Sequence, residues 1–125
     1  IVIWLNAPTL PDNLGPNDIW MGPSGYQHSI AVTGTSRMVM AADMGAILDC
    51  ANGSAQAISL PLVASEDIPV GTVIAVERNG AGAVTVAIPA GGTINGVDNA
   101  SVTVNSIACF RHRAADQWVA YGDLA

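Results

Sequence analysis

The sequence predicts an all-β protein, either an antiparallel β-sandwich or a jelly-roll-like barrel with an extended N-terminal arm. Short segments that alternate apolar and polar residues recur at intervals of about 8–12 residues, which is typical of these folds. The 13 glycines and seven prolines are spread along the 125 residues, as expected for many turns between short strands. Helical periodicity is nearly absent. A chain of this length suits a single domain with one core.

The strands expected after residue 27 are each followed by residues that favour turns. Asn52-Gly53 is a strong turn dipeptide, and Asn79–Gly82 is predicted to close a hairpin. Single helical turns are expected at Ala41–Gly45 and Ala64–Ile68. The predicted strands are His28–Thr33, Ser36–Met40, Ala46–Cys50, Ala55–Leu60, Thr72–Arg78, Ala83–Ile88, Thr93–Asn95, Ser101–Val104, Ser106–His112 and Gln117–Tyr121.

Residues 1–27 differ from the β domain expected over residues 28–125, because they hold four of the seven prolines. Proline fixes φ and lacks an N–H group, so we expect an extended arm with turns, strand-like at Ile1–Leu5 and Ile19–Met21. Chain ends fray, so an apolar strand at Ile1 indicates either further chain upstream or a neighbour that covers it.

Large apolar side chains in such an arm have no core of their own, which predicts that they contact a partner or a second copy. Trp118, in the alternating last strand, fits either the domain core or a subunit contact. The predicted contact residues are Ile3, Trp4, Leu5, Trp20 and Trp118.

The composition argues against nucleic-acid and membrane-spanning classes. Lysine is absent, four arginines face ten acidic residues, and the net charge is −6. Arg111-His112-Arg113 is the one cationic cluster, and we expect it to be solvated or salt-bridged, since phosphate binding needs a larger basic patch. No stretch approaches the ~20 apolar residues of a membrane helix. Half of the residues are hydrophobic and 11% are charged, so we expect copies or a partner to cover part of the surface.

The candidate catalytic groups do not form a recognisable constellation. His28 and His112 are the two imidazoles, and order along the chain does not define a catalytic triad. Glu66-Asp67 is more readily explained as the start of a helical turn than as a glycosidase pair. We therefore expect a non-enzymatic protein without a cofactor.

Metal binding is not expected either. Asp12, Asn13, Asn17 and Asp18 depart from the EF-hand pattern and are better explained by turns in which their side chains bond the local backbone. Cys50 and Cys109 lie far apart in apolar segments, which favours two buried free thiols, with a disulfide as the alternative.

Several segments occur in an order that points to a family. These are Ala41–Gly45, Ile58–Pro61, Pro69–Thr72, Arg78–Val86, Gly91–Gly96 and Gln117–Leu124. Over residues 40–124 the chain resembles the small β domains of tailed-bacteriophage virion proteins, found at the ends of tail fibres and as head decorations or head fibres. The resemblance implies a compact β fold, often trimeric, with a structural role on the particle surface and no catalytic residues. Residues 1–27 do not match the family pattern.

The short chain favours a head (capsid) decoration or head-fibre protein over a tail fibre. Its expected partners are further copies of itself, as a homotrimer, and other virion proteins such as the major capsid protein. One alternative is the tip of a tail fibre or spike that binds a host glycan, which requires a cleft with exposed aromatic and amide side chains. Another is a cellular carbohydrate-binding module, which requires Trp118 or Tyr121 to lie flat and exposed on a sheet.

Overall fold

The computed structural model describes residues 3–4, 19–20, 27–43 and 45–125, and the regular secondary structure among them is almost entirely β-strand. The helical element among them is one 3-10 turn, η1 (Ala41–Asp43), followed by Gly45 with φ of 72°, as the Ala41–Gly45 motif predicts. The strands are β1 (Ile3–Trp4), β2 (Ile19–Trp20), β3 (Ser29–Val32), β4 (Ser36–Met38), β5 (Ile47–Cys50), β6 (Gln56–Ser59), β7 (Val73–Arg78), β8 (Val84–Ala87), β9 (Thr93–Ile94), β10 (Asn99–Val102), β11 (Ser106–Ala114) and β12 (Gln117–Gly122).

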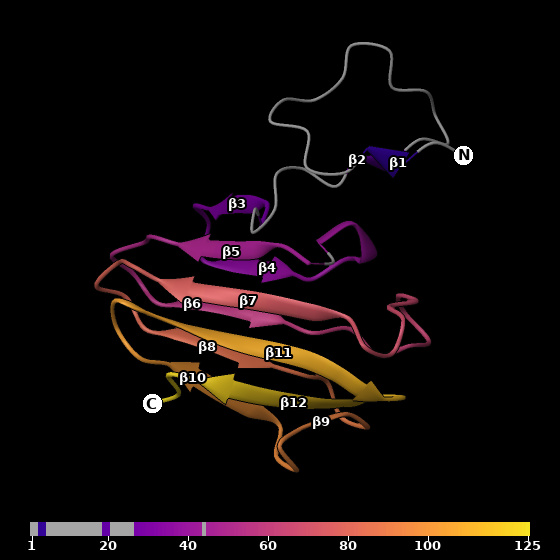
Figure 1. Cartoon of the computed structure of the whole chain (residues 1–125). Helices are drawn as coiled ribbons and strands as arrows, with labels where there is room; N and C mark the ends of the chain where they lie inside the picture. The colour runs from indigo at the N-terminus through magenta and orange to yellow at the C-terminus, as the bar shows by residue number, and fades with distance from the viewer. Residues whose placement is uncertain (1–2, 5–18, 21–26, 44) are drawn as a thin grey trace.

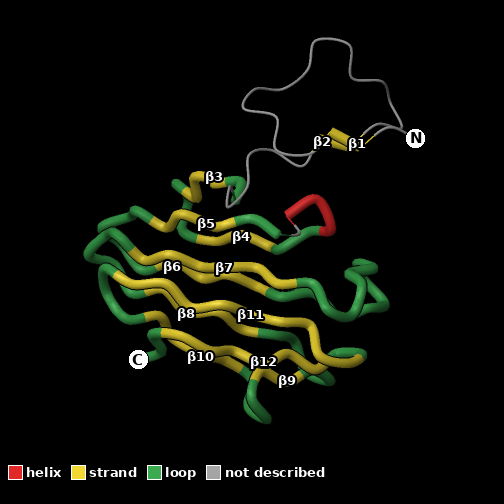
Figure 2. The backbone as a smooth tube through the Cα atoms, viewed as in Figure 1, coloured by secondary structure: helices red, strands yellow, loops and turns green. Residues whose placement is uncertain are grey.

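The chain coils as a short β-solenoid between two sheets. Strands β3, β5 and β7 lie parallel and adjacent in a six-stranded sheet of order β3-β5-β7-β11-β12-β9. Strands β4, β6 and β8 lie parallel and adjacent in a four-stranded sheet of order β10-β8-β6-β4. Each turn of the solenoid contributes one strand to each sheet, so the sheets form two facing layers (Figures 1 and 2).

Antiparallel strands close one end of this stack. Strand β11 pairs antiparallel with β7 and forms a hairpin with β12, while β10 pairs antiparallel with β8. Asp116, in the hairpin turn, has φ of 58°, and the register shifts between His112 and Ala114. The last strands therefore end the parallel coil instead of continuing it.

The core lies between the two sheets and is formed by alternate residues of each strand. Val84 and Val86 on β8 are completely buried, and Ile88, which directly follows β8, is nearly so, so all three side chains lie on the core side. The largest fully buried side chains include Trp118, Phe110, Leu48, Ile58 and Ile74.

The predicted all-β class is confirmed, and each strand expected after residue 27 overlaps an observed one, but the predicted antiparallel sandwich or jelly-roll-like barrel is wrong. The successive pairs β3–β5–β7 and β4–β6–β8 are parallel. The predicted hairpin at Asn79–Gly82 is also wrong, because this turn carries the chain from β7 in one sheet to β8 in the other. Such a turn is an arch, in which the strands that it joins face each other without pairing.

The arches at one side of the solenoid stack closely on one another. The Asn79 and Gly82 N–H groups donate to the carbonyl oxygens of Cys50 and Asn52, both at 3.0 Å. The Asn52 amide in turn donates to the Thr33 carbonyl of the preceding arch at 2.9 Å. Hydrogen bonds therefore connect all three arches, in the order of the strands.

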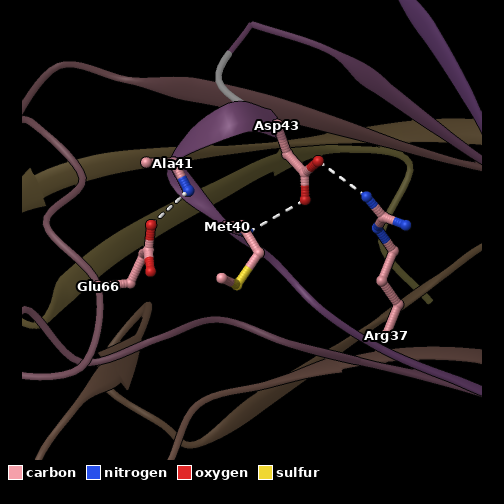
Figure 3. A network of polar contacts seen from close by, with 5 residues as sticks. All are labelled: Arg37, Met40, Ala41, Asp43 and Glu66. Atoms are coloured by element: carbon pink, nitrogen blue, oxygen red, sulfur yellow. Dashed lines mark hydrogen bonds and ion pairs between the residues drawn. The ribbon is translucent and has the colours of Figure 1, made fainter.

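A charged network holds the opposite side near η1 (Figure 3). The buried Asp43 carboxylate forms a 2.8 Å salt bridge with Arg37 and accepts the Met40 N–H at 3.1 Å. Glu66 was expected to begin a helical turn, but residues 64–68 are not helical, and its carboxylate accepts the N–H of Ala41 at 3.0 Å. Glu66 thus caps η1, which lies 25 residues earlier in the chain.

The N-terminal pair β1–β2 is parallel, with Ile3 opposite Ile19 and Trp4 opposite Trp20. The remainder of the predicted arm over residues 1–26 lies outside the described residues. Within the part that the structure describes, no helix is long and apolar enough to cross a membrane.

Candidate interaction surface

The outer face of the six-stranded sheet carries a central apolar row. Residues that alternate with the buried ones on β5, β11 and β12 point away from the core, and on β7 the equivalent position is held by Ala75, which is itself buried. The strand register places Tyr121, Cys109, Ala75 and Ile47 side by side across four strands. Val73 and Val119, which flank Arg111, extend the apolar surface on one side of this row. We call this face the apolar sheet face.

The two ends of the apolar sheet face carry opposite charges. Arg111 and Arg113 project at one end and are exposed. At the other end Glu77 and Asp49 lie in register on neighbouring strands, and Asp123 follows β12. The sheet face therefore has a cationic end, an apolar centre and an anionic end.

The outer face of the four-stranded sheet is different in character. Its outward positions on the two central strands β6 and β8 are small or hydroxylated, namely Ala57, Ser59, Thr85 and Ala87, whereas Met38 on the edge strand β4 is exposed. On their central strands, therefore, the six-stranded sheet carries large apolar side chains on its outer face and the four-stranded sheet does not.

A shallow cleft of about 440 Å³ opens at the anionic end of the apolar sheet face. Its lining residues are Glu77, Asn79, Asn105, Ser106, Ile107 and Asp123. Asn79 donates from its amide to the Asp49 carboxylate, which holds the amide over the sheet. Asn105 has φ of 55°, a left-handed conformation that asparagine tolerates better than most residues. The cleft thus offers carboxylate and amide groups beside an apolar side chain.

Tyr121 lies beside the cleft and is 49% exposed. Partial burial and the neighbouring Cys109 thiol raise the pKa of its hydroxyl above the ordinary value. Tyr121 is therefore a neutral aromatic group on an otherwise aliphatic surface near physiological pH.

The two cysteines lie on opposite faces of one sheet. Both are free thiols. Cys50 points into the core, whereas Cys109 is half-buried on the apolar sheet face, so the prediction that both are buried holds for Cys50 alone. Because the two side chains project from opposite faces, they cannot form the disulfide that the sequence left open.

Trp118 belongs to the core and is 2% exposed, so its side chain offers no surface to a partner. It stacks on His112 with ring centroids 4.7 Å apart, and His112 Nδ1 lies 2.8 Å from the Ile68 carbonyl oxygen. The contact role predicted for Trp118 is therefore wrong. This burial also separates His112 from the exposed Arg111 and Arg113 on either side of it.

The remaining predicted contact residues are not tested at the level of side chains. Leu5 lies outside the described residues, and for Ile3, Trp4 and Trp20 the structure describes the backbone pairing of β1 and β2. The same limit applies to Asp12, Asn13, Asn17 and Asp18, which all precede Ile19. Among the described residues, no group of three or more His, Cys, Asp or Glu side chains is placed to hold a metal ion.

Sequence reasoning missed the central apolar row. Alternation in Ser106–His112 and Gln117–Tyr121 indicates two faces for each strand, but it does not show that Cys109, Val119 and Tyr121 align with Ala75 and Ile47. That alignment depends on the pairing order of the strands.

Comparison with known proteins does not assign the chain to a family. No protein-family model matches it, and no curated protein is significantly similar to it.

Proposed function

We propose that this chain is a non-enzymatic structural protein of a bacteriophage particle, a head decoration or head-fibre protein that assembles as a homotrimer on the virion surface. The observation that carries the proposal is the apolar sheet face, which leaves Tyr121, Cys109, Val119 and Ile47 at least partly uncovered. A contiguous apolar surface of this kind is typical of a site of protein association.

The solenoid supports a structural role in a second way. Each strand of the parallel stack is bonded to its neighbours, and the arches that connect the sheets are bonded to one another. Rigid surfaces lose little conformational entropy on association, which favours stable attachment to other virion proteins such as the major capsid protein.

The test is immunogold electron microscopy of purified particles from a phage that carries this coding sequence. An antibody raised against residues 28–125 is expected to label intact heads. Label at the tail tip would favour the second candidate below. Particles without label, with the chain found in the lysate alone, would contradict a virion role altogether.

The second candidate is a tail-fibre or spike tip, or a carbohydrate-binding module, that binds a glycan in the cleft beside Tyr121. Amide and carboxylate groups can bind sugar hydroxyls, and an aromatic ring can stack on a sugar face. Binding to a glycan array is expected to be lost in Tyr121→Ala and Asp123→Asn, while Val70→Ala, at an exposed position outside the cleft lining, leaves it unchanged. Absence of binding by the wild-type chain would exclude this candidate for the glycans on the array.

A further inference from the structure

The charges on the apolar sheet face have an order that a second copy of the chain can complement. Arg111 and Arg113 lie at one end, and Glu77, Asp49 and Asp123 lie at the other. We propose that further copies of this chain cover the apolar sheet face, with the cationic end of each copy against the anionic end of the next. This inference rests on the self-assembly in the proposed function and names the surface and orientation that produce it.

The arginines lack ionic partners within the described part of their own chain. The salt bridge found there joins Arg37 to Asp43 and involves neither Arg111 nor Arg113. Arg111 lies between Val73 and Val119 in the sheet, so no carboxylate is beside it in register. The carboxylates at the opposite end lie on the far side of the central row, four residues away along β11, or about 13 Å.

The relative orientation of the copies follows from this separation. If the cationic ends of two copies met, arginines would lie against arginines, and if the anionic ends met, carboxylates would lie against carboxylates. Both arrangements are unfavourable. Opposite ends meet when a two-fold axis runs across the strands, or when a three-fold axis runs along the stacking direction of the solenoid. The proposed homotrimer corresponds to the three-fold arrangement, in which each end meets a neighbour around a closed ring.

The apolar row then lies at the centre of the assembly. Cys109, Ala75 and Ile47 are in the middle of the face, with charged residues on both sides. An apolar centre with a charged rim is the usual composition of a stable protein interface. Cys109 therefore reports on the assembly, because its partly exposed thiol becomes covered when copies associate.

The experiment measures molar mass by light scattering over a range of protein concentrations, for wild type and four variants. Arg111→Glu and Glu77→Arg each place like charges together and are expected to weaken association at least tenfold. The double variant Arg111→Glu/Glu77→Arg exchanges the two ends and is expected to restore most of the association. Asp98→Arg makes the same charge change as Glu77→Arg at an exposed site next to the four-stranded sheet, and it is expected to associate like wild type.

Two further measurements keep the result interpretable. Circular dichroism confirms that each variant is folded, and the rate of Cys109 alkylation is expected to fall at least tenfold at concentrations where wild type associates. A wild-type monomer at high micromolar concentration overturns the inference, as does an assembly that is insensitive to both charge reversals. Neither result affects the microscopy of particles, so the failure of this inference and the failure of a virion role are distinguishable.

Discussion

Gln56 shows how one buried polar side chain connects two turns of the solenoid. It is 2% exposed, and its amide nitrogen donates to the carbonyl oxygens of Val32 and Gly34, both at 2.8 Å. Its amide oxygen accepts the N–H of Asn52 at 3.3 Å. Without these contacts, backbone groups of two arches would face the core without a hydrogen-bond partner. Gln56 therefore supplies hydrogen bonds as well as packing.

Replacing Gln56 with Ala is expected to lower the free energy of unfolding by about 2–4 kcal/mol, because buried backbone groups lose their partners and a cavity remains. Gln117→Ala, at an exposed position on β12, is the matched control and is expected to change stability by less than about 0.5 kcal/mol. Urea unfolding of both variants measures the difference. Equal stabilities would show that the Gln56 contacts contribute little.

Cys50 makes stability depend on pH in the alkaline range. Burial, with a smaller contribution from Asp49, raises the pKa of its thiol from 9.0 to about 11. Between these values the unfolded thiol loses its proton while the folded thiol keeps it, so the stabilising difference is complete below pH 9.0 and is lost as pH rises. The free energy of unfolding is expected to fall by up to ~1.4 kcal/mol per pH unit in this window.

The measurement is urea unfolding across that pH range for wild type and Cys50→Ala. Tyr121 titrates in both proteins, so the difference between the two slopes isolates the Cys50 thiol. Identical slopes would mean that Cys50 does not contribute to the alkaline loss of stability.

At the scale of the element, the close stacking of the arches imposes a requirement for glycine. A Cβ atom at Gly82 would lie 1.9 Å from the Ser54 carbonyl oxygen, and one at Gly80 would lie 2.5 Å from the Asn52 carbonyl oxygen. Both contacts are with backbone, which cannot move aside without separating the arches. A Cβ atom at Gly53, in the neighbouring arch, would meet open space.

Gly82→Ala is therefore expected to destabilise the fold by about 2–3 kcal/mol through overpacking, whereas Gly53→Ala is expected to cost less than about 1 kcal/mol. Thermal unfolding followed by circular dichroism compares the two variants. The prediction is contradicted if both substitutions lower the melting temperature to the same extent.

The arches also show where sequence reasoning succeeds and where it stops. Alternation and turn residues locate strands such as Val73–Arg78 and Val84–Ala87, because both signals are local. Asn79–Gly82 favours a turn, but its local chemistry does not determine whether the next strand pairs with the last or crosses to the other sheet. The glycines that suit a tight hairpin here permit a close approach to the Ala51–Ser54 backbone.

The candidate surface could be predicted only in part, because local sequence signals do not show which strands become neighbours. Arg111 and Arg113 are recognisable as an exposed cationic pair, but the carboxylates opposite them come from β5, β7 and the chain after β12. The last strand is apolar on both faces, so its sequence does not show which face is buried; in the structure Trp118 lies in the core, where its ring stacks on His112.

At the scale of the molecule, the fold is a stack whose two ends are unequal. Strands β11 and β12 continue the six-stranded sheet beyond β7, whereas β3 and β4 form the edges at the other end. In stacked architectures each turn is stabilised mainly by its neighbours, so an element bonded on one side opens more readily than one bonded on both. Strand β7 has β5 on one side and β11 on the other, whereas β3 is bonded to β5 alone within its sheet.

Native-state hydrogen exchange is therefore expected to be slowest in β7 and to increase toward β3. The β7 amides should exchange through global unfolding, and the β3 amides through local opening at lower free energy. Ile58→Ala removes a fully buried side chain from the four-stranded sheet and is expected to cost about 2–5 kcal/mol. This substitution should lower the free energy of exchange of the β7 amides by its whole cost in global stability. The free energy of exchange of the β3 amides should stay nearly unchanged, because local opening of β3 does not expose the Ile58 site. Equal protection in β3 and β7, or an equal loss in both strands, would show that the stack unfolds as one cooperative unit.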